Sequence, residues 1–353
     1  MGGSPGGSTE RIRSGGLRRF VLAAATVALV AGGCGSLSAQ AQAVPANPVA
    51  NEVAAVGADV PLSAPVTPAW QVAWVTPSVQ LTGLAVFNAN SVWVAGSDGV
   101  VYAWDGTGWH VRRVDDDIIR MAAVSPTAAW VASDDGIRQW NGSKWTLTSH
   151  DGTVLALAAA DGRHAWAATA TGIRAWDGSG WPLAYPADGT RFTGIAALDA
   201  THAWAVGTAS DGSGVVVAWD GSRWSLQATL PEPLSAVYAS DAQNAWAVSP
   251  EGSIYEWNGT AWDLTVDLHL ALNGVAGTNA SHVWVTADSG QVLFHDGATW
   301  HVQYQAPTTV SAVAAADPGD VWAIGFDTVY TTVASAADSA TSASSGTSTA
   351  PGF

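Results

Sequence analysis

The amino-acid sequence predicts an all-β fold, a seven-bladed β-propeller of four-stranded blades. Three observations support this prediction. Short runs of β-forming residues alternate with turns rich in Gly, Asp, Asn and Ser, a pattern typical of antiparallel strands. A unit of roughly 38 residues repeats along the chain, as it does in propellers. An N-terminal segment also matches the one strand that the last repeat lacks.

Tryptophan marks the period of the repeat. One set lies in short apolar runs, with separations of 37, 36, 38, 42, 38 and 38 residues: Trp93, Trp130, Trp166, Trp204, Trp246, Trp284 and Trp322. A second set follows 10 to 15 residues later: Trp104, Trp140, Trp176, Trp219 and Trp257. A third lies five residues further on: Trp109, Trp145, Trp181, Trp224, Trp262 and Trp300.

Each unit divides into four predicted strands. In the first unit they are LTGLAV (81–86), SVWVAG (91–96), VVYAW (100–104) and WHVRRV (109–114). Six complete units run from Leu81 to about Thr309, and a seventh (310–333) stops after three strands. The segment AWQVAWV (69–75) resembles the fourth strand of a unit, so we expect it to close the last blade.

The tryptophans that flank each turn, as in WDGTGW (104–109), are predicted to belong to the core. A four-residue hairpin loop places the two rings on adjacent strands and on one face. Blades pack against neighbours on both faces and need large apolar groups there. We therefore predict as core residues Trp93, Trp104, Trp109, Trp204, Trp219 and Trp224. The alternative is one aromatic sugar site per blade.

The blade text LSAVYASDAQNAWAVSPEGSIYEWNGTAWDLT (234–265) resembles tectonin-type repeats and is similar to the WD-like and YVTN-like repeats of bacterial envelope propellers. The resemblance covers the whole predicted propeller and consists of structural residues. It implies a propeller that binds a protein or, as in tectonin-type lectins, a carbohydrate.

The N-terminus is typical of an exported lipoprotein. Four arginines precede the apolar run FVLAAATVALVA (20–31), which is too short to span a bilayer and suits a signal peptide (1–33). Cys34 follows at once and resembles the lipidated cysteine of a lipobox, although Ala31 stands where Leu is usual. Ordinary secretion, with cleavage after Ala41 or Ala43, is the alternative.

Three further segments complete the predicted organisation. An Ala-, Val- and Pro-rich spacer (34–65) precedes the propeller (66–333), and a Ser/Thr/Ala-rich tail (334–353) is predicted to be disordered. We expect a monomer that is held on the extracytoplasmic face of the cell membrane by a lipid anchor alone, or secreted if Cys34 is not lipidated.

Charge and motifs narrow the function. Nine basic and 28 acidic residues follow position 33, a net charge of −19, which argues against a nucleic-acid partner. The sequence offers no catalytic set, cofactor motif or metal-ligand spacing. His164, His202 and His282 share one repeat position and are predicted to cap turns, since other repeats have Asp, Asn or Ser there. We expect a non-enzymatic module; a hydrolase or lyase is the third hypothesis, because propellers host such chemistry.

Acidic residues in the loops that vary between repeats define the candidate binding face. These residues are Asp98, Asp115, Asp116, Asp117, Asp134, Asp135, Asp211, Glu251 and Asp288. They would attract a cationic patch, a basic peptide or Ca²⁺, or simply keep an exported protein soluble. The enlarged loop 207–215 is a candidate contact. The partner would be an envelope protein or a glycan.

Overall fold

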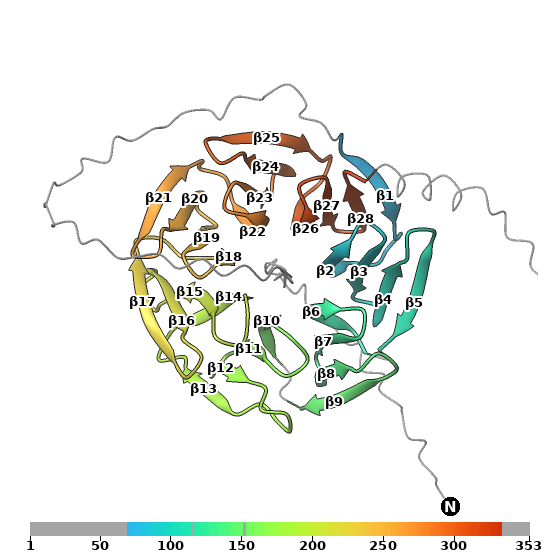
Figure 1. Ribbon diagram of the computed structural model, residues 1–353, viewed down its shortest axis with the longest axis horizontal. Coiled ribbons are helices and arrows are strands. Elements are labelled where there is room, and N and C mark those ends of the chain that lie inside the picture. The colour runs from blue at the N-terminus through green and yellow to red at the C-terminus, as the bar shows by residue number, and fades with distance from the viewer. Residues whose placement is uncertain (1–68, 115, 151–152, 334–353) are drawn as a thin grey trace, which may run out of the picture.

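The computed structural model describes residues 69–114, 116–150 and 153–333, which form a closed ring of seven antiparallel sheets with four strands each (Figure 1). The predicted all-β seven-bladed propeller is confirmed. The predicted signal peptide, spacer and tail, as well as Cys34 and the predicted propeller boundary at 66, lie outside the described residues. No helix within the described ranges is long and apolar enough to cross a membrane.

The blades follow one another in chain order, and in each the first strand lies toward the centre of the ring and the fourth at its rim (Figure 1). Blade 1 contains β2(Leu81–Asn88), β3(Ser91–Gly96), β4(Val100–Trp104) and β5(Trp109–Arg113). Blade 2 contains β6(Ile118–Ser125), β7(Ala128–Ser133), β8(Gly136–Trp140) and β9(Trp145–Ser149). Blade 3 contains β10(Val154–Ala159), β11(Ala165–Thr169), β12(Gly172–Ala175) and β13(Leu183–Pro186).

The remaining blades keep this plan. Blade 4 contains β14(Arg191–Ala197), β15(Ala203–Thr208), β16(Gly214–Trp219) and β17(Trp224–Leu230). Blade 5 contains β18(Ala236–Asp241), β19(Asn244–Val248), β20(Ser253–Trp257) and β21(Trp262–Asp267). Blade 6 contains β22(Leu272–Asn279), β23(His282–Ala287), β24(Gln291–His295) and β25(Trp300–Gln305). Blade 7 contains β26(Val310–Asp317), β27(Asp320–Gly325), β28(Thr328–Thr331) and the N-terminal β1(Gln71–Val75).

The ring closes in blade 7, as predicted. Strand β1 pairs antiparallel with β28, from Gln71 opposite Thr331 to Val75 opposite Thr328. The side chain of Gln71 also donates a hydrogen bond from Nε2 to the carbonyl oxygen of Val333, at 2.9 Å. The two ends of the described chain are thus joined in one sheet by noncovalent contacts.

The turn between the third and fourth strands shows why the repeated sequence folds as it does. Trp104 and Trp109 are cross-strand partners, as are Trp219 and Trp224. In the first of these turns the Oδ1 atom of Asp105 accepts hydrogen bonds from the backbone N–H groups of Thr107 and Gly108, both at 2.9 Å. Gly106 has a φ of 91°, a conformation that side chains disfavour, so the Asp-Gly pair suits this turn.

Blade 3 departs from the predicted pattern. Its third strand ends at Ala175, so Trp176 and Trp181 lie outside the ladder, and β13 begins only at Leu183. Pro182 has no N–H group to donate to the ladder, which accounts for the late start of that strand. The two indole rings nevertheless remain 5.7 Å apart.

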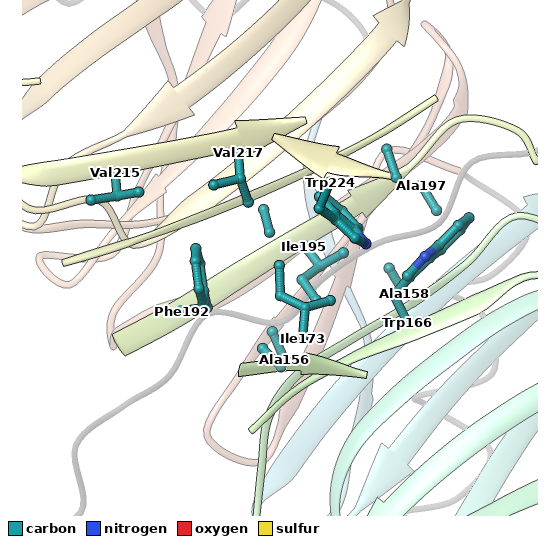
Figure 2. Close-up of a cluster of buried hydrophobic side chains, with 13 residues drawn as sticks. Ala156, Ala158, Trp166, Ile173, Phe192, Ile195, Ala197, Val215, Val217 and Trp224 are labelled. Atoms are coloured by element: carbon teal, nitrogen blue, oxygen red, sulfur yellow. The ribbon is translucent and has the colours of Figure 1, made fainter. Parts of the chain in front are cut away.

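The core lies between neighbouring blades, and its largest members are the tryptophans. The first set is almost completely buried, with exposed fractions of 0% to 3%. Figure 2 shows the cluster between blades 3 and 4, in which Trp166 of blade 3 meets Trp224 of blade 4 edge-on with ring centres 6.2 Å apart. Phe192 and Ile195 of β14 pack in the same cluster, together with smaller residues of both blades. Burial of each such ring contributes several kcal/mol, up to about 4–6.

Candidate binding surface

The loops that join the second strand of a blade to the third, and each blade to the next, lie together on one face of the ring. We call this the loop face. Backbone hydrogen bonds connect the two kinds of loop: Ser97 N–H donates to Gln80, Ala187 N–H to Thr171, and Asp288 N–H to Ala271. The distances are 2.8, 3.0 and 2.9 Å. Loop sequences from all parts of the chain therefore share one surface.

The candidate acids that the structure describes all lie on the loop face. Asp115 lies outside the described residues. Asp116 is half-buried, whereas the others are exposed: Asp98, Asp117, Asp134, Asp135, Asp211, Glu251 and Asp288. They share one face, but their side chains differ in the partners they already have; their role in binding stays a prediction.

Asp116 and Asp135 are held by Arg138 of β8. One guanidinium nitrogen of Arg138 lies 3.3 Å from Asp116 Oδ2 and the other lies 2.9 Å from Asp135 Oδ2. A hydrogen bond with Ser133, and then Arg138, keep the pKa of Asp116 below its usual value against the opposing effect of burial. Both carboxylates are thus structural acids that fix Arg138 at the junction of blades 1 and 2.

Three further candidates also have intramolecular partners. Asp98 accepts a 2.5 Å hydrogen bond from the Tyr102 hydroxyl, and burial, then this bond, raise the pKa of Tyr102. Asp288 accepts one from Asn273 Nδ2 at 2.7 Å. Asp211 accepts two from Ser213, which lower its pKa and hold the turn of the 207–215 loop. That loop is a hairpin connection between the extended strands β15 and β16.

Asp117, Asp134 and Glu251 differ from these. Each is exposed, and the carboxylate of each has no hydrogen bond or ion pair to another residue in the described ranges. They are therefore the candidate acids best able to meet a partner.

Metal binding has no ready site on this face. In the part of the chain that the structure describes, no three His, Cys, Asp or Glu side chains come close enough to hold a metal ion. The proposed Ca²⁺ partner therefore has no preformed cluster of ligands among these residues.

The three repeat-related histidines do not cap the turns themselves, because Asp161, Asp199 and Asn279 accept the backbone N–H bonds there and the histidine rings contact these capping side chains. His164 Nδ1 lies 2.8 Å from Asp161 Oδ2, and His202 Nδ1 lies 3.0 Å from Asp199 Oδ2. His282 makes the equivalent contact at 3.0 Å with Asn279. Each contact stays within one turn, so the histidines do not converge on a common site.

The tryptophans are used by the core. All 20 lie in the described ranges, and each is buried or half-buried. Among the six predicted core positions, Trp93, Trp104, Trp204 and Trp224 are at most 5% exposed. Trp109 is half-buried and stacks on Trp74 at 4.9 Å, and Trp219 is half-buried beside Trp166 at 6.0 Å.

Sequence reasoning missed a cavity of about 570 Å³ at the junction of blades 1 and 2. Its lining residues are Val111, Arg112, Arg113, Val114, Arg138, Trp140, Ser143, Lys144 and Trp145. One signal was present in the sequence. Five of the nine basic residues after position 33 fall between 112 and 144, in a chain whose net charge is negative.

Solved structures share this fold. The structure of YCF48 bound to D1 peptide superposes with a TM-score of 0.61 at 16% identity, covering 77% of this chain and 99% of that one. YCF48 from Cyanidioschyzon merolae superposes with a TM-score of 0.59 at 18% identity, covering 74% of this chain and 98% of that one. The RRP9 WD40 repeats superpose with a TM-score of 0.63 at 13% identity, covering 77% of this chain and 99% of that one.

At these identities the likeness shows the propeller fold alone. The expected similarity to WD-type propellers thus holds at the level of fold, whereas the tectonin-like and YVTN-like resemblances stay predictions. The sequence matches no family model. It also matches no curated protein.

Proposed function

We propose that this propeller is a non-enzymatic, protein-binding scaffold that uses its loop face. The observation that carries the proposal is the use of all 20 tryptophans in packing. A lectin with one aromatic sugar site per blade needs rings that stand open to solvent. Here the repeated aromatics stabilise the ring, and the residues that vary between blades lie in the loops. Specific recognition then falls to the variable loops.

The comparisons support this proposal indirectly. One propeller of the same fold is YCF48, which binds a D1 peptide in its solved structure, and another is built of WD40 repeats. Binding of a protein segment to a ring of this architecture is therefore physically reasonable for the present chain as well.

The proposed site of action is the cell envelope. The arginine-rich start, the short apolar run and Cys34 support export followed by lipid attachment. A body that carries a net negative charge after position 33 has little attraction to anionic lipids, so the lipid would be the only membrane contact.

Affinity capture from an envelope extract tests the proposal. The bait is the full chain with Cys34→Ser, and its matched variant also carries Asp117→Asn, Asp134→Asn and Glu251→Gln. We expect a protein partner that the variant loses, with an unchanged melting temperature, because these exposed side chains have no partner within the ring.

Two variants on the opposite face provide the control. Asp105→Ala and Asp177→Ala remove carboxylates that hold turns between third and fourth strands, so they should lower the melting temperature and keep the partner. Loss of the partner in these variants alone would place the site on the wrong face. Binding of a glycan array by the bait, with no captured protein, would favour the lectin alternative.

A further inference from the structure

The cavity between blades 1 and 2 combines cationic and aromatic side chains. Arg112 reaches it from β5, and Arg138, Trp140 and Trp145 come from β8 and β9. Strand β5 lies at the rim of the ring beside the hairpin of β8 and β9 (Figure 1). The cavity therefore lies between rim strands of the two blades.

Arg112 is the unusual residue of this junction. Its guanidinium carbon lies 5.1 Å from the ring centre of Trp93 and 5.3 Å from that of Trp140, so indoles from both blades hold it in place. The Nε atom is buried, yet no acceptor within the described part of the chain hydrogen-bonds to it. A buried donor on a cation without an acceptor is costly. No carboxylate among the described residues pairs with Arg112, so an anion in the adjoining cavity would offset its charge.

At some other junctions the equivalent position supplies a hydrogen-bond acceptor to the next blade. Three residues after the tryptophan that begins the fourth strand, Thr148 accepts an indole N–H bond from Trp181 of the next blade at 3.0 Å. Gln227 does the same for Trp262, also at 3.0 Å. Arg112 occupies the equivalent position in blade 1 and can only donate.

The consequence is a second unpaired donor. Trp145 is the equivalent indole of blade 2, and its buried Nε1 has no acceptor among the described residues. An unpaired indole alone is uninformative, because Trp224, which follows Ala184 in the previous blade, is unpaired too. At the junction of blades 1 and 2, an arginine stands where blades 2 and 4 have the neutral acceptors Thr148 and Gln227. This junction therefore has both an unpaired cation and an unpaired indole beside the cavity.

We propose that this cleft binds a carboxylate side chain of an acidic segment in a partner protein. The inference rests on the proposed function. The cleft would be a second contact site for the same partner, in addition to the loop face. Arg112, Arg113 and Lys144 supply the positive charge, since Arg138 is already paired with Asp116 and Asp135.

The walls favour a peptide over a small hydrated anion. Trp140, Trp145 and the exposed Val111 offer apolar contacts to the methylene groups and backbone beside a carboxylate. Strand β5 is the outermost strand of its blade and pairs only with β4, so its free edge is accessible to an extended segment.

The test uses a fluorescein-labelled peptide in which Glu alternates with Thr, and a counterpart with Gln in place of Glu. Fluorescence anisotropy with the full chain carrying Cys34→Ser should show binding of the first peptide and binding about tenfold weaker or absent for the second. Arg112→Gln should weaken binding of the Glu peptide by a similar factor. This variant introduces the residue found in blade 4, where it accepts the neighbouring indole, so the ring should stay folded.

Two more variants keep the test decisive if Arg112→Gln disturbs the core. Lys144→Gln changes an exposed side chain of the cleft and should weaken binding a few-fold. Arg223→Gln removes the same charge in blade 4, far from the cleft, and should leave binding unchanged.

Equal binding of the Glu and Gln peptides, or full binding by both Arg112→Gln and Lys144→Gln, would overturn the proposal. So would a site that takes inorganic phosphate in an Arg112-dependent manner but not the Glu peptide. If the peptide fails to bind while a partner is still captured through the loop face, this site alone is wrong and the proposed function stands.

Discussion

Asp320 is an ionisable side chain buried inside the ring. It is 2% exposed, and its Oδ1 accepts a 2.8 Å hydrogen bond from the indole N–H of Trp322. Its Oδ2 is buried and has no hydrogen-bond partner among the described residues. Burial raises the pKa of Asp320 to about 6, opposed by the bond from Trp322 and assisted by the charge of Asp317. The ionised carboxylate therefore destabilises blade 7 at neutral pH.

The sign of its pH dependence follows from linkage. Because the folded-state pKa of Asp320 exceeds the unfolded value of about 4, the folded chain holds the proton between these limits. The contribution of Asp320 to stability is therefore greatest below about pH 4 and declines as pH rises to about 6. Above that pH the folded protein holds the carboxylate in its charged form, and the free energy of unfolding is lowered by the full penalty of burying this charge.

We expect Asp320→Asn to raise the free energy of unfolding at pH 7 by about 2 kcal/mol, and by much less at pH 4. Asparagine keeps an acceptor for Trp322 without a charge, and Asn244 occupies the same position in blade 5. Urea unfolding of parent and variant at both pH values provides the difference, from which shared titrations cancel. An equal difference at the two pH values would show that ionisation of Asp320 plays no part.

At the scale of strands, the sequence was most informative where local chemistry decides the structure. Turns such as Asp105–Gly106 fix hairpins within a few residues, and recurrent tryptophans identify which strands face a neighbouring blade. The prediction failed at Trp176, where Pro182 removes a ladder hydrogen bond. The cleft beside Arg112 was not predicted, because it depends on contacts between two blades whose relative placement appears only in the folded ring.

The candidate acids illustrate the same limit. Loop position predicts that Asp116 and Asp117 reach one face, but adjacent residues in sequence have different roles there. Asp116 is paired with Arg138 of the next blade, whereas Asp117 is exposed. Such pairing across blades has no counterpart in the local sequence pattern.

Strand β1 is predicted to be required for the stability of the closed ring. Deleting residues 69–75 exposes the edge of β28 and removes Trp74, which stacks on Trp109, as well as the bond from Trp70 to Gln303. We expect a loss of at least about 3 kcal/mol in the free energy of unfolding, with aggregation through the free edge. Thermal melting followed by light scattering measures both effects.

The matched control for this deletion removes seven residues from the Ser/Thr/Ala-rich stretch 340–353, which should melt like the parent. If the β1 deletion also melts at the parent temperature, the N-terminal strand is dispensable for closure and its pairing with β28 contributes little.

For the whole molecule, the prediction concerns attachment. Cys34→Ala removes the thiol that a lipid would modify, so the protein should move from the membrane fraction to the soluble fraction of the producing cells or to the medium. Fractionation followed by immunoblotting measures this change. Asp105→Ala, a change far from the N-terminus, should fractionate like the parent. An unchanged distribution for Cys34→Ala would contradict lipid anchoring.

The closure of blade 7 means that the ring has no intrinsic starting point. Gln71 and Val333 are in hydrogen-bonding contact, so a short linker could join the two ends, and the chain could begin instead at the 207–215 loop. Such a circular permutant would keep all seven sheets and every interface between blades, while its termini moved to blade 4. The position of the termini on the ring is thus independent of the fold, and a segment joined to them, such as the proposed lipid tether, would leave from another blade while the fold stayed the same.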